Sequence, residues 1–375
     1  MTATPETLSV WSPGRINLIG EHTDYNDGWV LPLAIERGNT ITAHARADTV
    51  LQTTAQRFDG ETDSVHLDDL VGNIPEGWRG YVRGAAQAVQ DAGVRLRGAE
   101  LTIAGDLPLS GGLSSSASLA VGVALALMAL VDHHATPSEL ALMAQRAERE
   151  YVGVNCGIMD QLAIAAGVAN HALLIDCRSL AVTPVPMPAE VALVVVDSGV
   201  PRTLAGSAYN ERRRECETAV AAIQTLDPTI TALRDVSPAL LQQAAERGLV
   251  AGVILARARH VVHENGRVMT AVAALTQGDV ATLGRLMNES HFSLRDDYAV
   301  SGPELDTLTA MLRDMPGVWG ARLTGAGFGG CCIALVNRAQ VATIVAEIGP
   351  RYDAATGRTS MVFSTNAAAG AHVEQ

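Results

Sequence analysis

The feature that most constrains how this chain folds is a loop rich in glycine and serine, followed by a long apolar helix. The loop covers residues 107–118, LPLSGGLSSSAS, and comes after the predicted strand AELTIAGDLPL. The helix begins near Ser114 or Ser115 and runs through SLAVGVALALMALVD, with apolar residues on nearly every side. Such a helix has to be buried. The chain must therefore build a domain core around it, with the loop at its amino end.

The loop itself allows two interpretations. Glycines let the backbone approach an anion closely, and the free N–H groups and dipole of a helix amino end favour a phosphate group there. Alternatively, the serines only cap the buried helix. The phosphate loop G-x-x-x-x-G-K-[ST] carries a lysine, whereas all 27 basic residues here are arginine and the chain contains no lysine. P-loop NTPases, sites of the protein-kinase type and Schiff-base enzymes are therefore excluded.

Composition predicts a globular protein of two domains. The chain has 375 residues, of which 48% are hydrophobic and 18% are charged. The proline-rich stretch TPVPMPAE at 183–190 is the candidate boundary, which gives domains over residues 1–188 and 189–375.

Charge and cysteine usage limit the partners and the compartment. The net charge of −13 predicts that neither nucleic acid nor a membrane is a partner. The five cysteines form no C-x-x-C pair, and the first residues, MTATPETLSV, do not resemble a secretory signal. We therefore expect a cytoplasmic protein.

A second stretch, GRINLIGEHTDYN at residues 14–26, gathers charged side chains around a short apolar run. It contains Arg15, Glu21, His22 and Asp24. A calcium loop is a poor match, because the closing glutamate is missing. The stretch can be a solvated turn with a paired arginine and carboxylate. It can equally bind the hydroxyl groups of a sugar, which need several hydrogen-bond acceptors at fixed angles. The residues alone leave both interpretations open.

Two shorter patterns are weak evidence when each is taken alone. In NCGIMDQ, Asp160 follows Gly157 in the first turn of a predicted helix over 158–166, where the helix dipole already favours a carboxylate. The stretch TGAGFGG at 324–330 precedes a strand instead of a helix, so it is not a dinucleotide-binding fingerprint. It is a loop that needs a close backbone approach.

A capping box predicts a helix from residue 137 to about Tyr151. Glu148 and Glu150 flank its apolar stripe, one on each side, and the helical pattern does not distinguish them. His260 and His263 lie three residues apart on another predicted helix, but no third metal ligand accompanies them. We interpret these histidines as core or surface residues.

Taken together, these stretches resemble the galactokinase family of the GHMP kinases. GRINLIGEHTDYNDG resembles the galactokinase signature almost letter for letter, while PLSGGLSSSAS and TGAGFGG are similar to GHMP kinase motifs. The segments VGVNCGIMDQ, LLIDCRSL, GSAYNERRRECE and ESHFSLRDDY are similar to galactokinase segments in the same order. The resemblance extends over roughly residues 10–370.

The resemblance implies a mixed α/β, two-domain GHMP-kinase fold of the α+β class. A ribosomal-protein-S5-domain-2-like N-terminal domain and a ferredoxin-like C-terminal α+β domain would hold the active site between them. The implied reaction of galactose metabolism (the Leloir pathway) transfers the γ-phosphate of ATP to O1 of α-D-galactose, giving α-D-galactose 1-phosphate and ADP. The alternatives are a kinase for N-acetylgalactosamine or arabinose, and a non-catalytic sensor of galactose and ATP. Family habit predicts a monomer.

The resemblance also implies roles for individual residues. Asp160 would be the catalytic carboxylate that accepts or orients the proton of the C1 hydroxyl, and Arg15 would stabilise the transition state. The residues that would bind galactose are Glu21, His22, Thr23, Asp24, Gly157 and Tyr209. The residues that would bind the ATP phosphates are Ser110, Gly111, Gly112, Leu113, Ser114, Ser115 and Ser116. Mg²⁺ would be held by Ser116 and Glu148, because the family's spacing from the catalytic aspartate selects Glu148.

The sequence departs from the family pattern at two places. The chain before Trp11 is shorter than in many galactokinases, which puts an N-terminal helix in doubt. Ala326 stands where the third motif commonly has glycine, and we expect it to be tolerated if its φ is negative.

Overall fold

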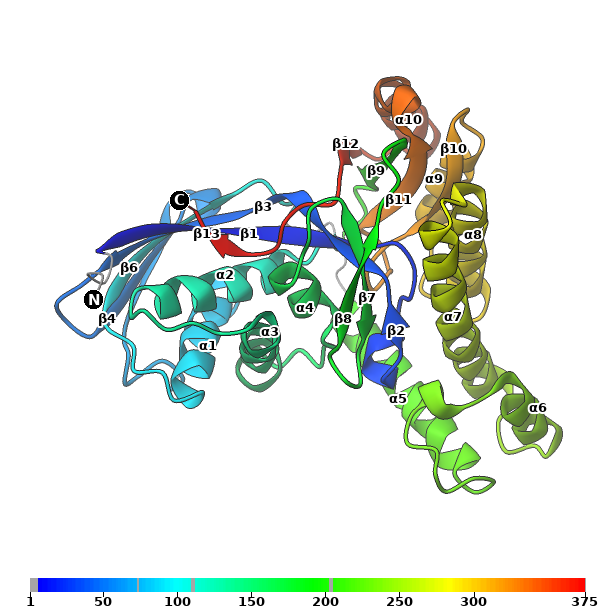
Figure 1. The fold of residues 1–375 in the computed structure, drawn as a ribbon, viewed down its shortest axis with the longest axis horizontal. Helices are drawn as coiled ribbons and strands as arrows, with labels where there is room; N and C mark the ends of the chain where they lie inside the picture. Colours follow the sequence, from blue (N-terminus) through cyan, green and yellow to red (C-terminus); the bar gives the residue numbers. More distant parts are fainter. Residues whose placement is uncertain (1–5, 73, 109–111, 202–204, 375) are drawn as a thin grey trace.

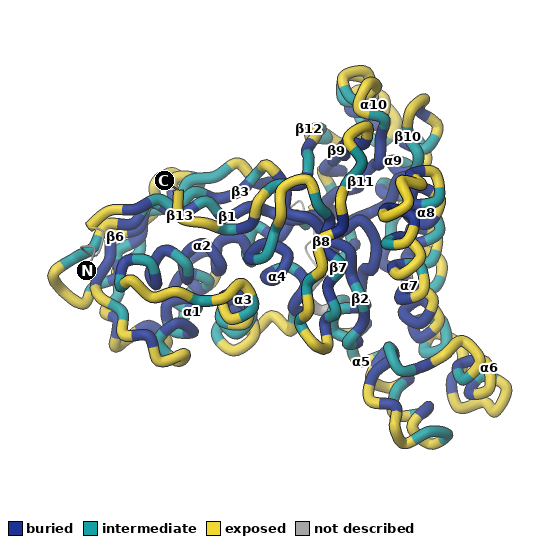
Figure 2. The backbone as a smooth tube through the Cα atoms, viewed as in Figure 1, coloured by how far each residue is buried: buried dark blue, intermediate teal, exposed yellow. Residues whose placement is uncertain are grey.

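The computed structural model describes residues 6–72, 74–108, 112–201 and 205–374. Three arms meet at a central junction (Figure 1). One arm holds a large sheet with helices α1 to α4, the second holds a smaller sheet with α8 to α10, and the third is helical around α5 and α6. Figure 2 shows that the strands and the inner helices carry most of the buried residues, while the outer turns of the arms are exposed.

The first arm is built on a six-stranded sheet. Its order is β13-β1-β3-β6-β4-β5, and all neighbours are antiparallel except β4 and β6. The strands are β1 (Thr7–Asn17), β3 (Pro32–Ala45), β4 (Val50–Ala55), β5 (Glu61–His66), β6 (Ala99–Gly105) and β13 (His372–Val373). The described chain thus begins directly with a strand, apart from Glu6. Since β13 pairs with β1, the C-terminal end of the chain returns to the N-terminal sheet.

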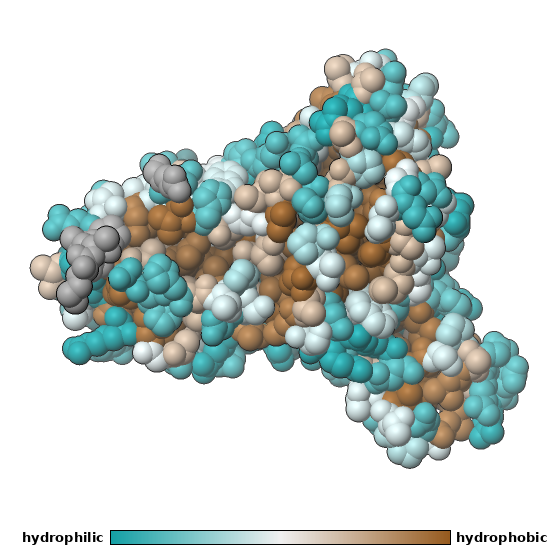
Figure 3. All heavy atoms as spheres, in the orientation of Figure 1, coloured by the Kyte–Doolittle hydropathy of each residue, from teal (hydrophilic) through white to brown (hydrophobic). Residues whose placement is uncertain are grey.

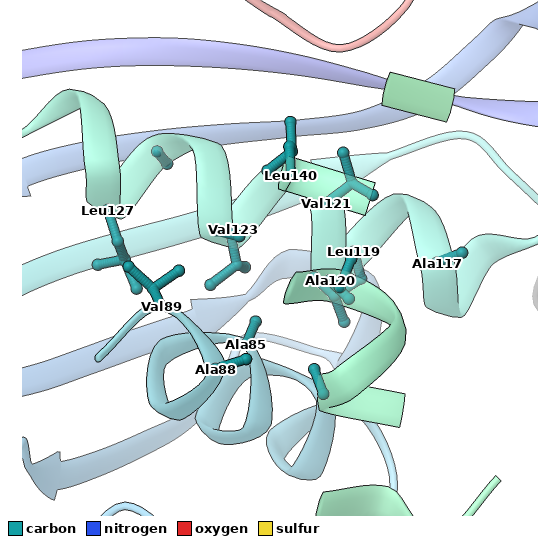
Figure 4. Close-up of a cluster of buried hydrophobic side chains, with 14 of the residues drawn as sticks. Ala85, Ala88, Val89, Ala117, Leu119, Ala120, Val121, Val123, Leu127 and Leu140 are labelled. Carbon is teal, nitrogen blue, oxygen red and sulfur yellow. The ribbon is translucent and has the colours of Figure 1, made fainter. Parts of the chain in front are cut away.

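Four helices cover one face of this sheet (Figure 1). They are α1 (Trp78–Asp91), α2 (Ser115–Ala129), α3 (Pro137–Arg146) and α4 (Met159–Ala165). The predicted buried helix is confirmed as α2, in which 11 of 15 residues are buried. Figure 4 shows Val123 and Leu127 of α2 next to Ala85, Ala88 and Val89 of α1. The sheet and the outer helices therefore enclose α2, which fixes the position of its amino end.

The second arm carries a four-stranded antiparallel sheet of order β10-β11-β9-β12. Its strands are β9 (Val191–Asp197), β10 (Val318–Leu323), β11 (Cys331–Asn337) and β12 (Met361–Thr365). The remaining helices are α5 (Ala205–Ile223), α6 (Pro238–Glu246), α7 (Gly252–Thr276), α8 (Val280–Asp296), α9 (Pro303–Arg313) and α10 (Val341–Thr356). Helices α8, α9 and α10 pack on this sheet, and α7 packs beside α5, α6 and α8.

A three-stranded sheet of order β2-β7-β8 lies at the junction. Its strands are β2 (Trp29–Val30), β7 (His171–Asp176) and β8 (Val182–Pro186). The first half of the proline-rich stretch 183–190 therefore belongs to a strand. Prolines are tolerated in β8 because it is an edge strand, where a missing N–H breaks no ladder. The boundary at residue 188 itself stays a prediction.

A separate hydrophobic core ties the two halves together. It contains Ile16 and Leu33 from the N-terminal sheet together with Val195, Val268 and Ile333 from the C-terminal half, all of them fully buried. Apolar surface is also visible between the arms, whose tips are mostly polar (Figure 3). In the described part of the chain, no helix combines the length and the apolar character that a membrane crossing requires.

Candidate active site

One cavity of about 710 Å³ collects nearly all of the residues that the sequence singled out. This volume is within the usual range of small-molecule sites. The predicted site residues that line it are Arg15, Glu21, His22, Asp24, Gly112, Ser114, Ser115, Ser116, Glu148, Gly157, Asp160 and Tyr209. Ser110 and Gly111 lie outside the described residues. The cavity is lined from both halves of the chain, because Tyr209, Gly325 and Ala326 belong to the C-terminal half.

Asp160 and Arg15 form an ion pair inside this cavity. Arg15 donates from Nε to Asp160 Oδ1 over 2.7 Å, its Nη2 lies 2.6 Å from the same oxygen, and its Nη1 donates to Gly112 O over 2.8 Å. The Arg15 side chain is only 5% exposed, whereas that of Asp160 is 28% exposed. The buried guanidinium is therefore fixed by its bond to Gly112 O, and the Asp160 carboxylate remains partly accessible from the cavity.

A bulge in β1 brings Arg15 to this position. The pairing of β1 with β3 shifts register between Pro13 and Arg15. At Gly14, a Cβ would lie 2.8 Å from Leu113 O, so only glycine allows the strand to approach the serine loop this closely. The backbone N–H of Arg15 donates to Leu113 O over 3.1 Å. Leu113 therefore anchors the loop with its main chain, while its side chain is buried in the junction core.

The serine loop does more than cap α2. Ser114 immediately precedes the helix, but its hydroxyl makes no capping hydrogen bond and its φ is +59°, a left-handed conformation that is uncommon for serine. Instead, Ser114 Oγ donates to Asp160 Oδ2 over 2.5 Å. The capping interpretation is thus wrong for Ser114. Its hydroxyl and Arg15 together hold the Asp160 carboxylate.

Glu21 also lines the cavity and connects both halves of the protein. Its Oε1 accepts from Gly325 N over 2.7 Å and lies 3.4 Å from Arg322 Nη2. Burial raises the pKa of Glu21, and the positive charges of Arg322 and Arg15 oppose this shift. The loop that carries Gly325 also touches the serine loop, since a Cβ at Gly325 would lie 2.9 Å from Gly112 O. Ala326 has no positive φ, unlike Gly325 and Phe328, so the condition set for its tolerance is met.

Asp24 packs against Gly157. A Cβ at Gly157 would lie 1.8 Å from Asp24 Oδ2, which explains why this position needs glycine. Burial raises the pKa of Asp24 to about 7, and repulsion from Asp160 adds to the shift. Two carboxylates that repel one another therefore line the cavity: Asp160 is paired with Arg15, whereas no described ion pair includes Asp24.

His22 and Thr23 differ in their surroundings, although they are adjacent in sequence. His22 has a φ of +63° and lines the cavity, with Nε2 3.2 Å from Ala326 O and Nδ1 2.9 Å from the Tyr25 hydroxyl. Thr23 is fully buried, and its hydroxyl lies 2.8 Å from both Gly20 O and Trp29 O. Thr23 is not one of the described residues that line the cavity. Its hydroxyl stabilises the turn instead.

Tyr209 completes this end of the cavity from α5. Its ring lies 5.7 Å from the His22 ring and 5.2 Å from the Tyr25 ring, measured between centroids. Burial raises the pKa of Tyr209 well above its usual value, so the hydroxyl stays protonated at neutral pH. It can therefore donate a hydrogen bond to a ligand oxygen.

Glu148 and Ser116 form the third polar group of the cavity. The helix α3 ends at Arg146, earlier than predicted, and continues as a π-helical turn over Ala147–Val152. This wider turn buries Glu148 while Glu150 stays exposed, which resolves the ambiguity that the helical pattern left open. Burial raises the pKa of Glu148 to about 7. Its side chain hydrogen-bonds with Ser116, and Glu148 Oε1 accepts from Gln161 Nε2 over 2.7 Å.

The donor chemistry of this pair fits a hard divalent cation. Carboxylate and hydroxyl oxygens are ligands that Mg²⁺ accepts, and Mg²⁺ commonly takes its other ligands from phosphates and water. No cluster of three or more His, Cys, Asp or Glu side chains suited to a metal occurs among the described residues. A metal here would thus depend on its nucleotide for most of its ligands.

His260, in contrast, is fully buried and bonds to Ser293 and to Glu21 O, as expected for a core histidine.

The far end of the cavity is apolar, and the sequence did not indicate it. Its walls come from five different elements or connections, with Phe58 and Trp78 stacked at 6.4 Å between ring centroids. The residues that line this end are Ala55, Phe58, Trp78, Tyr81, Ile103 and Leu119. The chain has only 4 phenylalanines and 4 tryptophans. Their rarity could have drawn attention to Phe58 and Trp78, but only the fold shows that the two rings line one cavity.

The comparisons with known proteins agree with this geometry. Residues 80–168 match the GHMP kinases N terminal domain, residues 271–354 the GHMP kinases C terminal domain, and residues 2–45 the galactokinase galactose-binding signature. A galactokinase of Roseiflexus sp. is 49% identical over 361 residues, which cover 96% of this chain and 91% of that protein. A galactokinase of Chloroflexus aggregans is 47% identical over 367 residues, covering 98% and 93%. The crystal structure of Lactococcus lactis galactokinase complexed with galactose has a TM-score of 0.92 at 38% identity, covering 98% of this chain and 95% of that one.

The two-domain fold and the matches to both of its domain families define the chain as a GHMP kinase. Within that class it belongs to the galactokinase family, because its relatives are similar over nearly their whole length and it carries the galactose-binding signature. The protein is accordingly an ATP-dependent sugar kinase. The predicted family and fold class are confirmed. Enzymes of this kind generally use ATP together with a divalent metal.

Proposed function

We propose that this protein transfers the γ-phosphoryl group of ATP to O1 of α-D-galactose and releases α-D-galactose 1-phosphate and ADP. The observation that carries the proposal is the Asp160 carboxylate, which Arg15 and Ser114 hold at the point where the serine loop meets the sugar-binding turn. We choose galactose as the acceptor for two reasons. The similar Lactococcus lactis structure contains this sugar, and residues 2–45 match the galactose-binding signature.

The chemical step needs a carboxylate in this position. As O1 of the sugar attacks the γ-phosphorus in line, the O1–H bond breaks and its proton moves to Asp160. The new O1–P bond forms, and the P–O bond to the β-phosphate breaks with its electron pair leaving on ADP. Arg15 stabilises the negative charge of the transition state, and most of the acceleration comes from positioning and from charge stabilisation.

The sugar hydroxyls would be bound at the end of the cavity formed by the turn that carries Glu21, His22 and Asp24. We call this the sugar end. Glu21 and Asp24 offer acceptor oxygens, Tyr209 offers a donor and the His22 ring lines the same end, so several hydroxyl groups can be recognised at fixed angles. Gly157 gives Asp24 its room.

The nucleotide would occupy the rest of the cavity, which we call the nucleotide end. Its phosphates would lie against the backbone of residues 110–116 and the first free N–H groups of α2, where a helix amino end favours an anion. Mg²⁺, held by Ser116 and Glu148, would neutralise phosphate charge in the way that lysine does elsewhere. The base would enter the apolar end between Phe58, Trp78 and Leu119.

A sugar panel with an ADP readout tests the proposal. Purified protein with Mg·ATP is offered galactose, N-acetylgalactosamine and arabinose, and we expect galactose to give the highest kcat/KM. Asp160→Asn should abolish turnover while the protein stays folded, since the amide cannot take the proton. Asp197→Asn, at the end of β9, is the matched control because Asp197 is also mostly buried. Retained turnover in Asp160→Asn would refute the assigned role.

The two alternatives make different predictions in the same assay. A kinase for another sugar would prefer N-acetylgalactosamine or arabinose. A non-catalytic sensor would bind galactose and ATP without releasing ADP, yet Asp160, Ser116 and the small residue Ala117 are all in place here. We further propose that the protein is a monomer in the cytoplasm, and light scattering on the purified protein tests the first part.

A further inference from the structure

A row of hydrogen-bonded side chains runs behind the sugar end of the cavity. The Sγ of Cys216 in α5 lies 3.1 Å from the Tyr298 hydroxyl, which lies 2.7 Å from the Tyr25 hydroxyl. The Tyr25 hydroxyl in turn lies 2.9 Å from His22 Nδ1. The row ends at Ala326, whose carbonyl is 3.2 Å from His22 Nε2. Cys216, Tyr298 and His22 are almost completely buried.

The acceptor at the end of this row decides where every proton lies. A carbonyl oxygen can only accept, so His22 Nε2 carries a proton and donates to Ala326 O. Burial lowers the pKa of His22 well below its usual value, so the ring is neutral and Nδ1 is an acceptor.

The same logic continues backwards along the row. The Tyr25 hydroxyl donates its only proton to His22 Nδ1, so the Tyr298 hydroxyl must donate to Tyr25. The Cys216 thiol must then donate to Tyr298. Burial raises the pKa of Cys216 to about 11, which keeps this thiol protonated. All donors therefore point in one direction, from α5 to the glycine loop.

Tyr298 is held in place by contacts that do not involve its hydroxyl. Its ring lies between two imidazoles, 4.7 Å from that of His22 and 4.5 Å from that of His260. Its backbone carbonyl accepts from Arg212 Nε over 2.8 Å. Removing only the hydroxyl should therefore leave the ring and the local fold where they are.

We propose that Tyr25, Tyr298 and Cys216 are positioning residues that hold the His22 ring by donating to its Nδ1, in the Nε2–H tautomer that Ala326 O selects. Both ring nitrogens are then satisfied, Nδ1 by Tyr25 and Nε2 by Ala326 O, so the row fixes the orientation of a ring that lines the cavity. The proposal rests on the proposed function in one respect, namely that the ligand beside His22 is a sugar.

The tautomer is measured without any substrate. Nitrogen-15 NMR of histidine-labelled protein should show His22 with a proton on Nε2 only. Tyr25→Phe should shift the Nδ1 resonance, because Nδ1 then loses its hydrogen bond, while Nε2 keeps the proton that it donates to Ala326 O. The matched control is Tyr352→Phe, since the Tyr352 hydroxyl likewise donates a hydrogen bond, over 2.9 Å to Ser198 O, and Ser198 does not line the cavity. An unchanged His22 spectrum in Tyr25→Phe would overturn the proposal.

Kinetics then test whether the row serves the sugar. We expect the KM for galactose to rise about tenfold in Tyr25→Phe, about threefold in Tyr298→Phe and least in Cys216→Ala, with the KM for ATP unchanged throughout. Cys216→Ser should restore the wild-type value, because serine also donates. Equal effects on both substrates, or effects no larger than in Tyr352→Phe, would contradict the proposal. If the enzyme phosphorylated a different sugar, the tautomer result would still stand, which separates the two failures.

Discussion

The two ends of the active-site cavity are built on different principles. At the sugar end, polar side chains from one short turn are buried and hydrogen-bonded to distant parts of the chain, as between Glu21 and Gly325 or between His22 and Ala326. At the nucleotide end, apolar side chains such as Phe58 and Trp78 line the cavity together with Ser114–Ser116, and Glu148 is the one carboxylate among the described residues there.

This difference fits what each of the two proposed ligands requires. Sugar hydroxyls are distinguished only by the positions of donors and acceptors, so their partners have to be rigid, and burial provides that rigidity. A nucleotide offers a large flat base and a charged tail, which an apolar slot and a helix amino end can hold without many side chains. Asp160 and Arg15 lie where the two ends meet.

The largest effect is expected at this meeting point. Arg15→Lys keeps the charge but loses the forked contact with Asp160 and the bond to Gly112 O. We expect kcat to fall about 100-fold. Both KM values should change much less, because neither end of the cavity is altered. Steady-state kinetics measure this, with the exposed Arg285→Lys as the control. A fall in kcat of less than about threefold would mean that charge alone suffices at this position.

Gly157→Ala should damage the sugar end selectively. The new Cβ would lie 1.8 Å from Asp24 Oδ2, so the carboxylate has to move. We expect the KM for galactose to rise about tenfold or more and the KM for ATP to stay within about twofold. Gly266→Ala in α7 is a suitable control, since a Cβ there meets nothing within 4 Å. If both KM values rose together, the two ends could not be regarded as independent.

A smaller effect concerns the stability cost of a buried carboxylate. The pKa of Asp24 is raised from 3.8 to about 7, so its favourable contribution to folding is complete below pH 3.8 and is lost as the pH rises through 7. Asp24→Asn cannot ionise. We expect its free energy of unfolding to fall less between pH 5 and pH 8 than that of the wild type, by about 1–2 kcal/mol because Asp24 keeps some solvent contact. Urea titrations at both pH values measure this, and identical losses would contradict it.

Ala326→Gly is expected to have the smallest effect. The backbone of Ala326 does not need glycine, and its carbonyl still accepts from His22. Both KM values should stay within about twofold of the wild type, with a loss of stability of about 0.5 kcal/mol from the added chain entropy. Thermal unfolding and steady-state kinetics check both statements. A large rise in the KM for galactose would show that the methyl group itself orders the sugar end.

The comparison also explains what could be predicted from the sequence. The sugar end lies mostly within residues 14–26, so a contiguous pattern carried its charges, and the apolar run after the serine loop predicted the buried α2. The nucleotide end is assembled from Ala55, Phe58, Trp78 and Ile103, which share no local spacing. Only the tertiary fold brings them together.

Two local features escaped prediction for specific physical reasons. Capping was one of the two interpretations of the serines, but the left-handed φ of Ser114 turns its hydroxyl to Asp160, a residue 46 positions away. The helical pattern could not separate Glu148 from Glu150 because it assumed regular α-helix, whereas a π-helical turn decides which carboxylate is buried.

The central claim is that the two ends bind their ligands independently, with Glu148 serving the nucleotide and Asp24 the sugar. Calorimetric titration of galactose, and separately of Mg²⁺ with a non-hydrolysable ATP analogue, into Glu148→Gln and Asp24→Asn tests it directly. We predict a crossed pattern: Glu148→Gln weakens only the nucleotide, and Asp24→Asn weakens only galactose, each by about tenfold or more. Equal losses for both ligands in either variant would contradict the claim.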